Sequence, residues 1–391
     1  MASDRPGYFT RLKNSVIGFL MGMAMFLLAI PFLAWNENNV YKVRQGLKEG
    51  AKVVQSVPAQ PDSSRDQQLI HISGPVTTSR GVSDPVFQLD YDMLRLRRTV
   101  EMYQWDEDRE TRDGKTRYTY DQEWSESHND SSRFHSAGHD NPPPPPYSSE
   151  DFIANDARLG TYRVEPGQLR SAGGLAGVSN VQLPSQLIAQ GWSGGHGNVW
   201  FRGRGTLQSP QIGDVRVTFT ALPEGDMSLV GMQQGDRLAP WISSRDTEVL
   251  LVERGVQTAA VMFEHAQSRN SALGWALRAA GFAGMWIGLS LCLGPLSAVL
   301  SFIPGLSGIV SRVSGFVAFL IALIFAVTTI VLSWIFVRPL VLMLVIGGIV
   351  AVALIIGRLR GEKQPSAAPP PPPTGATMPP PPPPPPPPPA G

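Results

Sequence analysis

The stretch VSGFVAFLIALIFAVTTIVLSWIFVRPLVLMLVIGGIVAVALIIG, residues 313–357, contains one charged side chain, Arg338. A helix needs about 20 apolar residues to cross a hydrocarbon core roughly 30 Å thick. Arg338 and Pro339 divide the stretch into parts of 25 and 18 residues, each close to that length. Helices buried inside a soluble protein are the alternative, but such helices are rarely uncharged for so long. The stretch therefore predicts two membrane-spanning helices, at 313–337 and 340–357, joined by a tight corner.

Two more apolar runs, at 15–35 and 279–303, are free of Asp, Glu, Lys, Arg and His. The first follows basic residues, as a cleaved signal peptide would, but it is longer than the roughly 7–15 residues of a signal h-region. Near its end, at Trp35, the bulky Phe32 occupies a position where a cleavage site requires a small residue. A short Pro/Gly turn at 304–312 separates the second run from the third. We expect an integral membrane α-helical protein with four spans, one plus three.

Residues 36–278 form a charged, water-compatible block between the first and second spans. Strand-like patterns rich in β-branched and aromatic residues occur at 69–73, 93–103, 215–219 and 248–253. Asp113-Gly114 is a hairpin signal just before 117–120. Helical pattern is weaker and is confined to 38–55, 168–176 and 256–278. We expect a large β-rich α+β domain outside the membrane.

Charge in the short flanks predicts the orientation of the spans. The tails at 1–14 and 358–391 each carry three basic residues and one acidic residue. Four spans place both tails on one side of the membrane, so we expect both termini in the cytoplasm. The block at 36–278, whose net charge is −5, would then lie in the periplasm, outside the cell or in an organelle lumen.

Three proline tracts, at 142–146, 369–373 and 379–389, hold 21 of the 36 prolines. Such tracts adopt the polyproline II conformation and do not build a packed core. One interpretation is a ligand for SH3, WW or EVH1-type grooves, or a semi-rigid spacer. The other is a low-complexity segment without a dedicated partner. We expect 358–391 to be a Pro-rich, disordered cytoplasmic tail.

Residues with metal-binding or catalytic chemistry are sparse. One cysteine excludes a disulfide scaffold and a Cys-rich metal site, and a net charge of +1 argues against a nucleic-acid partner. His128, His135 and His139 are weak candidates for metal ligands, but the surrounding Asn, Ser and Gly residues favour a solvated loop. The acidic run at 106–110 lacks the ligand spacing of an EF-hand. No nucleophile-elbow, zincin or P-loop motif occurs, so we expect no enzyme and no cofactor.

Spans one, three and four contain no ionisable residue and span two has only Cys292, whereas a transporter or channel usually places ionisable groups at depth. Gly284 and Gly288 instead have the G-x-x-x-G spacing of closely packed helices, a signal with many false positives. A channel or transport accessory subunit is the alternative to a structural role. A metal-dependent hydrolase built on the three histidines is a third hypothesis.

Several short strings suggest a family. The most specific is LRRTVEMYQW at 96–105. The others are WNE at 35–37, LKEG at 47–50, SDP at 83–85, GHDNP at 138–142, GDVRV at 213–217, QGDRL at 234–238, LRAAG at 277–281 and RPL at 338–340. Together they resemble the LUMA family (transmembrane protein 43) over about 19–359, nearly everything but the tails.

The resemblance implies one span, a lumenal domain, three further spans and cytoplasmic termini, in agreement with the orientation predicted from charge. It also implies a non-enzymatic membrane organiser, because animal members reside in the endoplasmic reticulum and inner nuclear membrane, self-associate, and bind emerin and lamins. The short N-terminal tail and the polyproline tail depart from the animal pattern. A composition rich in Gly, Ala, Pro and Arg favours a bacterial gene and hence a bacterial inner membrane. Emerin- or lamin-type partners apply only to a eukaryotic chain.

We therefore expect a multi-pass scaffold in the lipid bilayer that forms a homo-oligomer and binds membrane-associated proteins through its β-rich domain. The candidate interaction residues lie in or beside the family strings. They are Arg97, Arg98, Glu101, Tyr103, Trp105, Gly213, Asp214, Arg216, Gly235, Asp236, Pro240, Arg338 and Pro339. The alternative for each is a role in a turn or the core, since Gly-Asp pairs suit turns.

Overall fold

The computed structural model describes residues 8–112, 115–178, 184–194, 197–293 and 307–360. The chain divides into two compact units, Met1–Val337 and Arg338–Gly391. The first unit contains most of the helices and all of the described strands, and the second contains one helix.

Three helices of the first unit are long and apolar enough to cross a membrane. They are α1 (Tyr8–Val53), α4 (Ala259–Cys292) and α6 (Ser307–Phe336). In the second unit, α7 (Pro339–Arg360) contains the shorter apolar helix Val341–Ile356. The predicted class, an integral membrane helical protein with a large β-rich domain, is confirmed.

α1 and α4 each join two segments that the sequence predicted as separate elements. α1 runs without a break from the first apolar stretch through the helix predicted at 38–55, because nothing after Trp35 interrupts its backbone hydrogen bonds. α4 likewise joins the predicted 256–278 helix to the second apolar run, starting after the N-cap Thr258, whose hydroxyl accepts from the Val261 amide. α6 begins at Ser307, inside the turn predicted at 304–312, where no proline follows Pro304. Residues 294–303 of the predicted second span, and 304–306 of that turn, lie outside the described residues.

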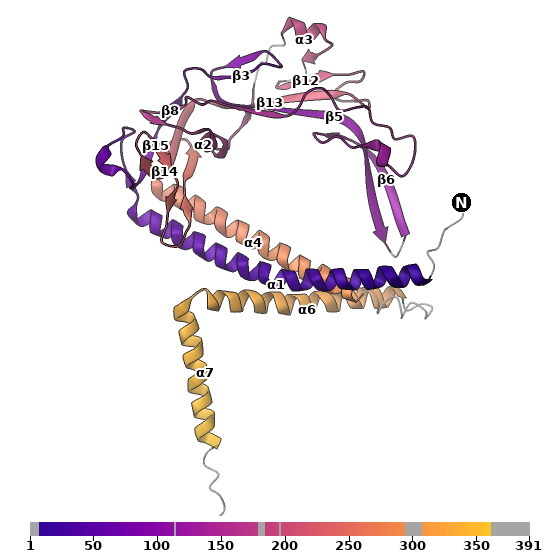
Figure 1. The fold of residues 1–391 in the computed structure, drawn as a ribbon, viewed down its shortest axis with the longest axis vertical. Helices are drawn as coiled ribbons and strands as arrows, with labels where there is room; N and C mark the ends of the chain where they lie inside the picture. The colour runs from indigo at the N-terminus through magenta and orange to yellow at the C-terminus, as the bar shows by residue number, and fades with distance from the viewer. Residues whose placement is uncertain (1–7, 113–114, 179–183, 195–196, 294–306, 361–391) are drawn as a thin grey trace, which may run out of the picture. The chain divides into compact units, whose positions relative to one another are not determined.

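The β-rich domain contains two seven-stranded sheets (Figure 1). The first has the order β1 (Gln55–Ser56), β2 (Leu69–Thr77), β8 (Arg158–Leu159), β9 (Tyr162–Arg163), β15 (Arg237–Ala239), β14 (Gly225–Gln234), β18 (Leu251–Arg254). An additional pairing of β2 with β14 closes the path from β2 to β14 on itself. The strand expected at 248–253 is divided at Leu250 into β17 (Glu248–Val249) and β18.

The second sheet is built around β5 (Met93–Arg112), a strand of 20 residues. Its order is β11 (Ser193–Gly194), β12 (Val199–Arg202), β13 (Val215–Pro223), β5, β6 (Lys115–Ser125), with β10 (Ala176–Gly177) on β13 and β7 (Glu150–Ile153) on β5. From Leu94 to Gln104 the even-numbered residues of β5 are buried, as expected for a strand with one face on a core.

The remaining elements are short. β3 (Val82–Asp84) pairs with β4 (Leu89–Tyr91), and β16 (Trp241–Ile242) pairs with β17 (Glu248–Val249). The small helices are α2 (Pro166–Ser171), α3 (Ser185–Ala189) and the 3-10 turns η1 (Ser63–Arg65) and η2 (Ser131–Arg133).

Three hydrophobic clusters hold the first unit together. The largest fills the interior of the β-rich domain. A second joins the end of α1 and the start of α4 to β2, β14 and β18, with Phe263 and Val230 both buried. A third lies among the apolar parts of α1, α4 and α6, with Leu33 and Met285 fully buried. α1 and α4 are therefore packed against the first sheet at one end and against each other and α6 at the other.

Candidate functional site

α1 and α4 lie side by side and antiparallel, and their contact follows a seven-residue repeat (Figure 1). On α1, one set of contact positions is Gly22, Ala29, Asn36, Val43 and Gly50, and the other is Phe26, Leu33, Val40 and Leu47. All nine are buried or half-buried. Alternating steps of three and four residues are the pattern of a left-handed coiled coil, and here it continues from the apolar run into the β-rich domain.

Glycines on α4 allow the two helices to approach closely. Gly274, Gly281 and Gly288 recur every seven residues and are all buried. A Cβ at Gly281 would come within 2.4 Å of Leu33 Cδ2, and one at Gly288 within 2.7 Å of the Gly22 carbonyl oxygen. Of the predicted G-x-x-x-G pair, Gly288 is in this contact, whereas a Cβ at Gly284 would meet only Ala29 Cβ at 4.0 Å.

A bidentate ion pair joins the helices where their apolar runs end. Arg278 Nε donates to Glu37 Oε1 at 2.6 Å, and Arg278 Nη2 donates to Glu37 Oε2 at 2.9 Å. Beside it, Asn36 Nδ2 donates to the Gly274 carbonyl at 3.2 Å, while Asn36 Oδ1 is buried without a hydrogen-bond partner. The guanidinium of Arg278 also lies 4.7 Å from the ring centre of Trp275. Trp275, like Trp35 on α1, is exposed, as expected for aromatics at a membrane interface.

Arg98 of β5 is the most buried charged residue among the predicted site residues, 1% exposed. Its Nη1 contacts both carboxylate oxygens of Asp84, at 2.5 and 2.6 Å, and its Nη2 donates to Glu150 at 2.9 Å. Asp84 is fully buried and also accepts from the amides of Val86 and Phe87. This pair fixes the β3–β4 turn against β5.

Glu101 and Arg216 form a second pair across neighbouring strands. They are direct partners in the β5–β13 register, and Arg216 Nε and Nη2 donate to the Glu101 carboxylate at 2.7 and 2.8 Å. The guanidinium stacks on Trp124 of β6, 4.6 Å from its ring centre. One side chain thereby links three adjacent strands of the sheet.

The side chains of Asp214 and Asn141 hold the loops beside β13 and β5 through hydrogen bonds to the backbone. The Asp214 carboxylate accepts from the amides of Arg204, Gly205 and Gln211 at 2.8–3.0 Å. Asn141 bonds the backbone of Trp105 as a strand would, accepting from its amide at 2.7 Å and donating to its carbonyl at 2.9 Å.

Comparison with known proteins identifies the family of this chain. The family model described as transmembrane protein 43 matches residues 102–339. The transmembrane protein 43 sequences of Mus musculus and Homo sapiens are each 30% identical to this chain, over 92% of it and 94% of the relative. The chain belongs to the transmembrane protein 43 family. A homolog from Drosophila melanogaster is 26% identical over 82% of this chain and 89% of its own. No solved structure matches.

The strings that resembled the transmembrane protein 43 family meet in pairs in space. WNE at 35–37 meets LRAAG at 277–281 through Glu37 and Arg278. LRRTVEMYQW at 96–105 meets SDP at 83–85 through Arg98, and it meets GDVRV at 213–217 through Glu101. Tyr103 also exchanges backbone hydrogen bonds with Gly213 and Asp214, both at 2.8 Å.

The other predicted site residues take no part in these ion pairs. Arg97 is exposed on β5, opposite Asp151 of β7. Gly235, with φ of 62°, and Asp236 form the turn between β14 and β15, and Pro240 is exposed after β15. Arg338 and Pro339 belong to the second unit, where Pro339 is the first residue of α7, a position that suits proline.

The three histidines do not converge on one point. His139 stacks on Tyr120 at 3.8 Å between ring centres, His135 stacks on Tyr118 at 4.1 Å, and His128 Nε2 lies 3.0 Å from the Pro142 carbonyl oxygen. Within the described ranges, no group of three or more His, Cys, Asp and Glu residues is arranged to hold a metal ion. The metal-dependent hydrolase therefore gains no support here.

The loop that carries these histidines is tied to the hairpin instead. Glu107 Oε2 accepts from the Tyr120 hydroxyl at 2.6 Å and from the His135 amide at 2.5 Å. The Tyr120 hydrogen bond, followed by that of His135, lowers the pKa of the Glu107 carboxyl below its ordinary value. The Glu107 carboxylate thus stays ionised and connects the histidine loop to Tyr120 of the β5–β6 hairpin.

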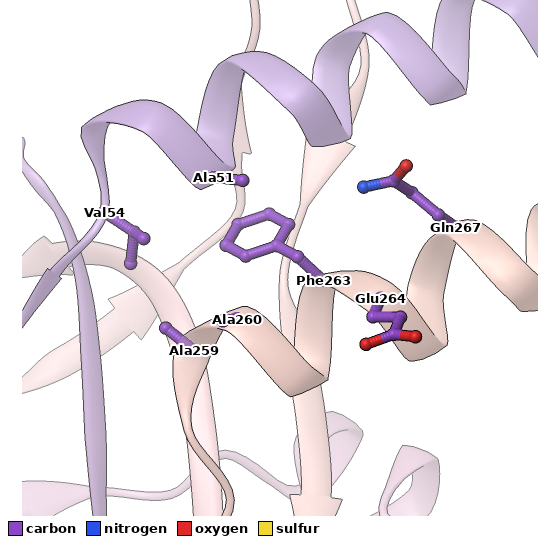
Figure 2. A pocket seen from close by; sticks show the side chains of 7 residues that line it. All are labelled: Ala51, Val54, Ala259, Ala260, Phe263, Glu264 and Gln267. Atoms are coloured by element: carbon purple, nitrogen blue, oxygen red, sulfur yellow. The ribbon is translucent and has the colours of Figure 1, made fainter.

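A groove of about 460 Å³ lies between the end of α1 and the start of α4 (Figure 2). It is lined by Ala51, Val54, Ala259, Ala260, Phe263, Glu264 and Gln267. Glu264 is the only ionisable residue among these seven, and Figure 2 shows its side chain at the groove. The lining residues therefore offer no pair of ionisable groups for acid–base chemistry. The groove offers an apolar contact surface.

Sequence reasoning missed the residues that join α1 to α4. Glu37 and Arg278 lie in two of the family strings, but nothing in the sequence pairs them, since 241 positions separate them. The seven-residue spacing of Gly274, Gly281 and Gly288 was a readable signal, because small residues at that period favour close helix contact.

Proposed function

We propose that this chain is a membrane scaffold that self-associates and binds partner membrane proteins through its β-rich domain. The observation that carries the proposal is the β5–β6 hairpin. β13 accompanies β5 only up to Met102, and β7 only along Arg95–Arg98, whereas β6 pairs with β5 as far as Arg112. The outer half of the hairpin is therefore an exposed two-stranded ribbon with edges available to a partner.

The connection to the membrane supports the same proposal. Because α1 and α4 are continuous from their apolar runs into the β-rich domain, a partner held by the domain would be held at a set position on the bilayer. The polar residues of the family strings are engaged in ion pairs and loop capping, which supports a structural rather than an enzymatic role. Cytoplasmic termini and a domain on the opposite side, as the flanking charges predict, complete the proposed topology.

Crosslinking and affinity purification from the native membrane test this function. Three proteins are compared: the full chain, a chain lacking 361–391, and a chain in which 108–119 is replaced by an Asn-Gly turn. We expect partners to be retained without the tail and lost without the ribbon. Partners that depend only on the tail would contradict the proposal. Ion flux through proteoliposomes containing this protein alone would favour the channel-type alternative instead.

A further inference from the structure

The ribbon of β5 and β6 lacks a third strand beyond Trp105. Asn141 bonds the Trp105 backbone, and after that point no strand of the described residues lies along either side of the ribbon. Two-stranded ribbons are marginally stable in water unless a further strand or a packed face supports them. The loop at 128–141 covers the face that carries Tyr118 and Tyr120, but it pairs with neither edge.

The outer edge of β6 is a row of unpaired backbone groups. Every β6 residue is matched to β5 on one side, without a bulge in the register. No backbone hydrogen bond between described residues reaches its other side. The strand contains no proline, and Arg117, Thr119, Asp121 and Glu123 are all exposed. An exposed edge of this length is a template for another strand.

The charges along β6 are ordered so that the strand complements itself. Basic residues come before Thr119 and acidic residues come after it. Antiparallel pairing of two β6 strands about a two-fold axis at Thr119 sets Arg117 opposite Asp121, and Lys115 opposite Glu123, twice each. The same register sets Tyr118 opposite Tyr120. Opposite charges and aromatic rings placed directly across a strand pair stabilise it.

Within one chain Arg117 lies opposite Glu110 of β5, but the acidic residues of β6 have no basic residue opposite them. Asp121 is matched to Asp106 in the β5–β6 register, and like charges directly opposite destabilise a strand pair. Among the ion pairs between described residues, none includes Arg117, Asp121 or Glu123. At the free edge of β5, a two-fold axis at Arg109 would set Arg109 opposite itself and Asp108 opposite Glu110.

We infer that two copies of this chain pair through the outer edges of β6, antiparallel and centred on Thr119, so that the second sheet continues from one copy into the other. This inference rests on the self-association in the proposed function, and it names the surface and the register. The interface is isologous, as in most homodimers.

Disulfide trapping in the full chain tests the register. In a Cys292→Ala background, Thr119→Cys places the two thiols on the axis. Directly opposed Cα atoms of antiparallel strands are about 4.5–5.5 Å apart, within the roughly 4.4–6.8 Å range of disulfides. Thr116→Cys is the matched control, because three residues from the axis its two copies are about 20 Å apart. We expect mild oxidation in membranes to convert most of the Thr119→Cys protein, and little of the Thr116→Cys protein, into a covalent dimer.

Charge reversal tests the pairing without a disulfide. Arg117→Asp and Asp121→Arg, each alone, set like charges opposite each other at two places, and we expect dimer association to weaken by about five-fold or more. The double reversal restores opposite charges and should restore the dimer. Both residues are exposed on the ribbon, so each variant should fold as the parent protein does. Asp121→Arg is the cleaner single variant, because it faces Asp106 of its own β5, whereas Arg117→Asp faces Glu110.

The outcomes separate this inference from the proposed function. An oligomer in mild detergent that neither forms the Thr119→Cys disulfide nor responds to charge reversal would overturn the β6 pairing and leave self-association standing. A strictly monomeric protein at membrane-like density would overturn both. Crosslinking of Thr119→Cys to a different membrane protein, without the homodimer, would assign the edge to another partner and also overturn the inference.

Discussion

Glu37 and Arg278 are the first charged residues beyond the apolar runs of α1 and α4, and they bind each other through two hydrogen bonds of 2.6 and 2.9 Å. Since each lies at the limit of its own apolar run, the ion pair brings both runs to the same level. Asn36, the residue before Glu37, donates to the Gly274 carbonyl, and together with the ion pair it sets the register of the two helices. Buried asparagines have this role in coiled coils.

Loss of Arg278 should destabilise the helix pair. Arg278→Met leaves Glu37, whose side chain is 4% exposed, without its cation. Removing one partner of a buried ion pair costs about 3–5 kcal/mol, and we expect about 2–4 kcal/mol here because Arg278 is partly exposed. Thermal unfolding of the full chain in detergent measures the change. Arg269→Met is the control, since Arg269 lies on the same helix as Arg278 and pairs with Glu253 of β18, but its side chain is 61% exposed. Equal midpoints for the two variants would contradict the prediction.

The two glycines of the G-x-x-x-G spacing should respond differently to alanine. At Gly288 a methyl group would lie 2.7 Å from the Gly22 carbonyl oxygen and 2.9 Å from the Phe26 amide nitrogen, and neither backbone can move aside. Gly284→Ala adds only a van der Waals contact with Ala29. We expect Gly288→Ala to cost about 1–3 kcal/mol and Gly284→Ala to be neutral. Resistance to proteolysis in micelles would report the difference, and equal resistance would rule out the close helix contact.

Arg97 and Arg98 are adjacent but should have opposite sensitivities. Arg98→Met leaves the fully buried Asp84 carboxylate unpaired, so we expect a loss of about 3–5 kcal/mol. Arg97→Met removes an exposed side chain and should change stability by less than about 0.5 kcal/mol. Denaturant unfolding followed by tryptophan fluorescence measures both. A tolerated Arg98→Met would show that the Asp84 pair does not hold the turn.

His71 should make stability depend on pH. Burial lowers the pKa of His71 below its ordinary 6.5, so the unfolded chain takes up a proton at a pH where the folded chain remains neutral. The folded state keeps its full stability above about pH 6.5 and loses stability as pH falls below that value. In the neutral ring, Nε2 faces the Gln257 carbonyl oxygen at 2.9 Å and Nδ1 faces the Ser56 hydroxyl at 3.0 Å.

The comparison variant for that prediction is His71→Gln, which retains hydrogen-bonding groups but does not titrate. Thermal midpoints at pH 8 and pH 5 should differ less in His71→Gln than in the parent protein. An unchanged difference between the two pH values would assign the acid sensitivity to other groups.

The membrane helices and the main strands were predictable because their signals are local. A charge-free run is visible in neighbouring residues. So is a strand pattern such as that of β5, in which every second residue from Leu94 to Gln104 is buried. The continuity of α1 was not predictable from composition, since polarity changes at Asn36 while the helix does not. Arg98 and Glu101 could be picked out from a family string, but their partners Asp84 and Arg216 follow from strand topology, which the sequence does not display.

The unbroken course of α1 has a consequence for changes in chain length. About 26 Å of helix separates Asn36 from Val53, and each residue of that helix advances about 1.5 Å and turns about 100°. One inserted residue would lift the β-rich domain and rotate it away from the α4 seam at the same time. The number of residues in this segment therefore sets both the distance of the domain from the membrane and its rotation about the helix axis. This segment should tolerate insertion only in whole heptads, and only if α4 lengthens with it.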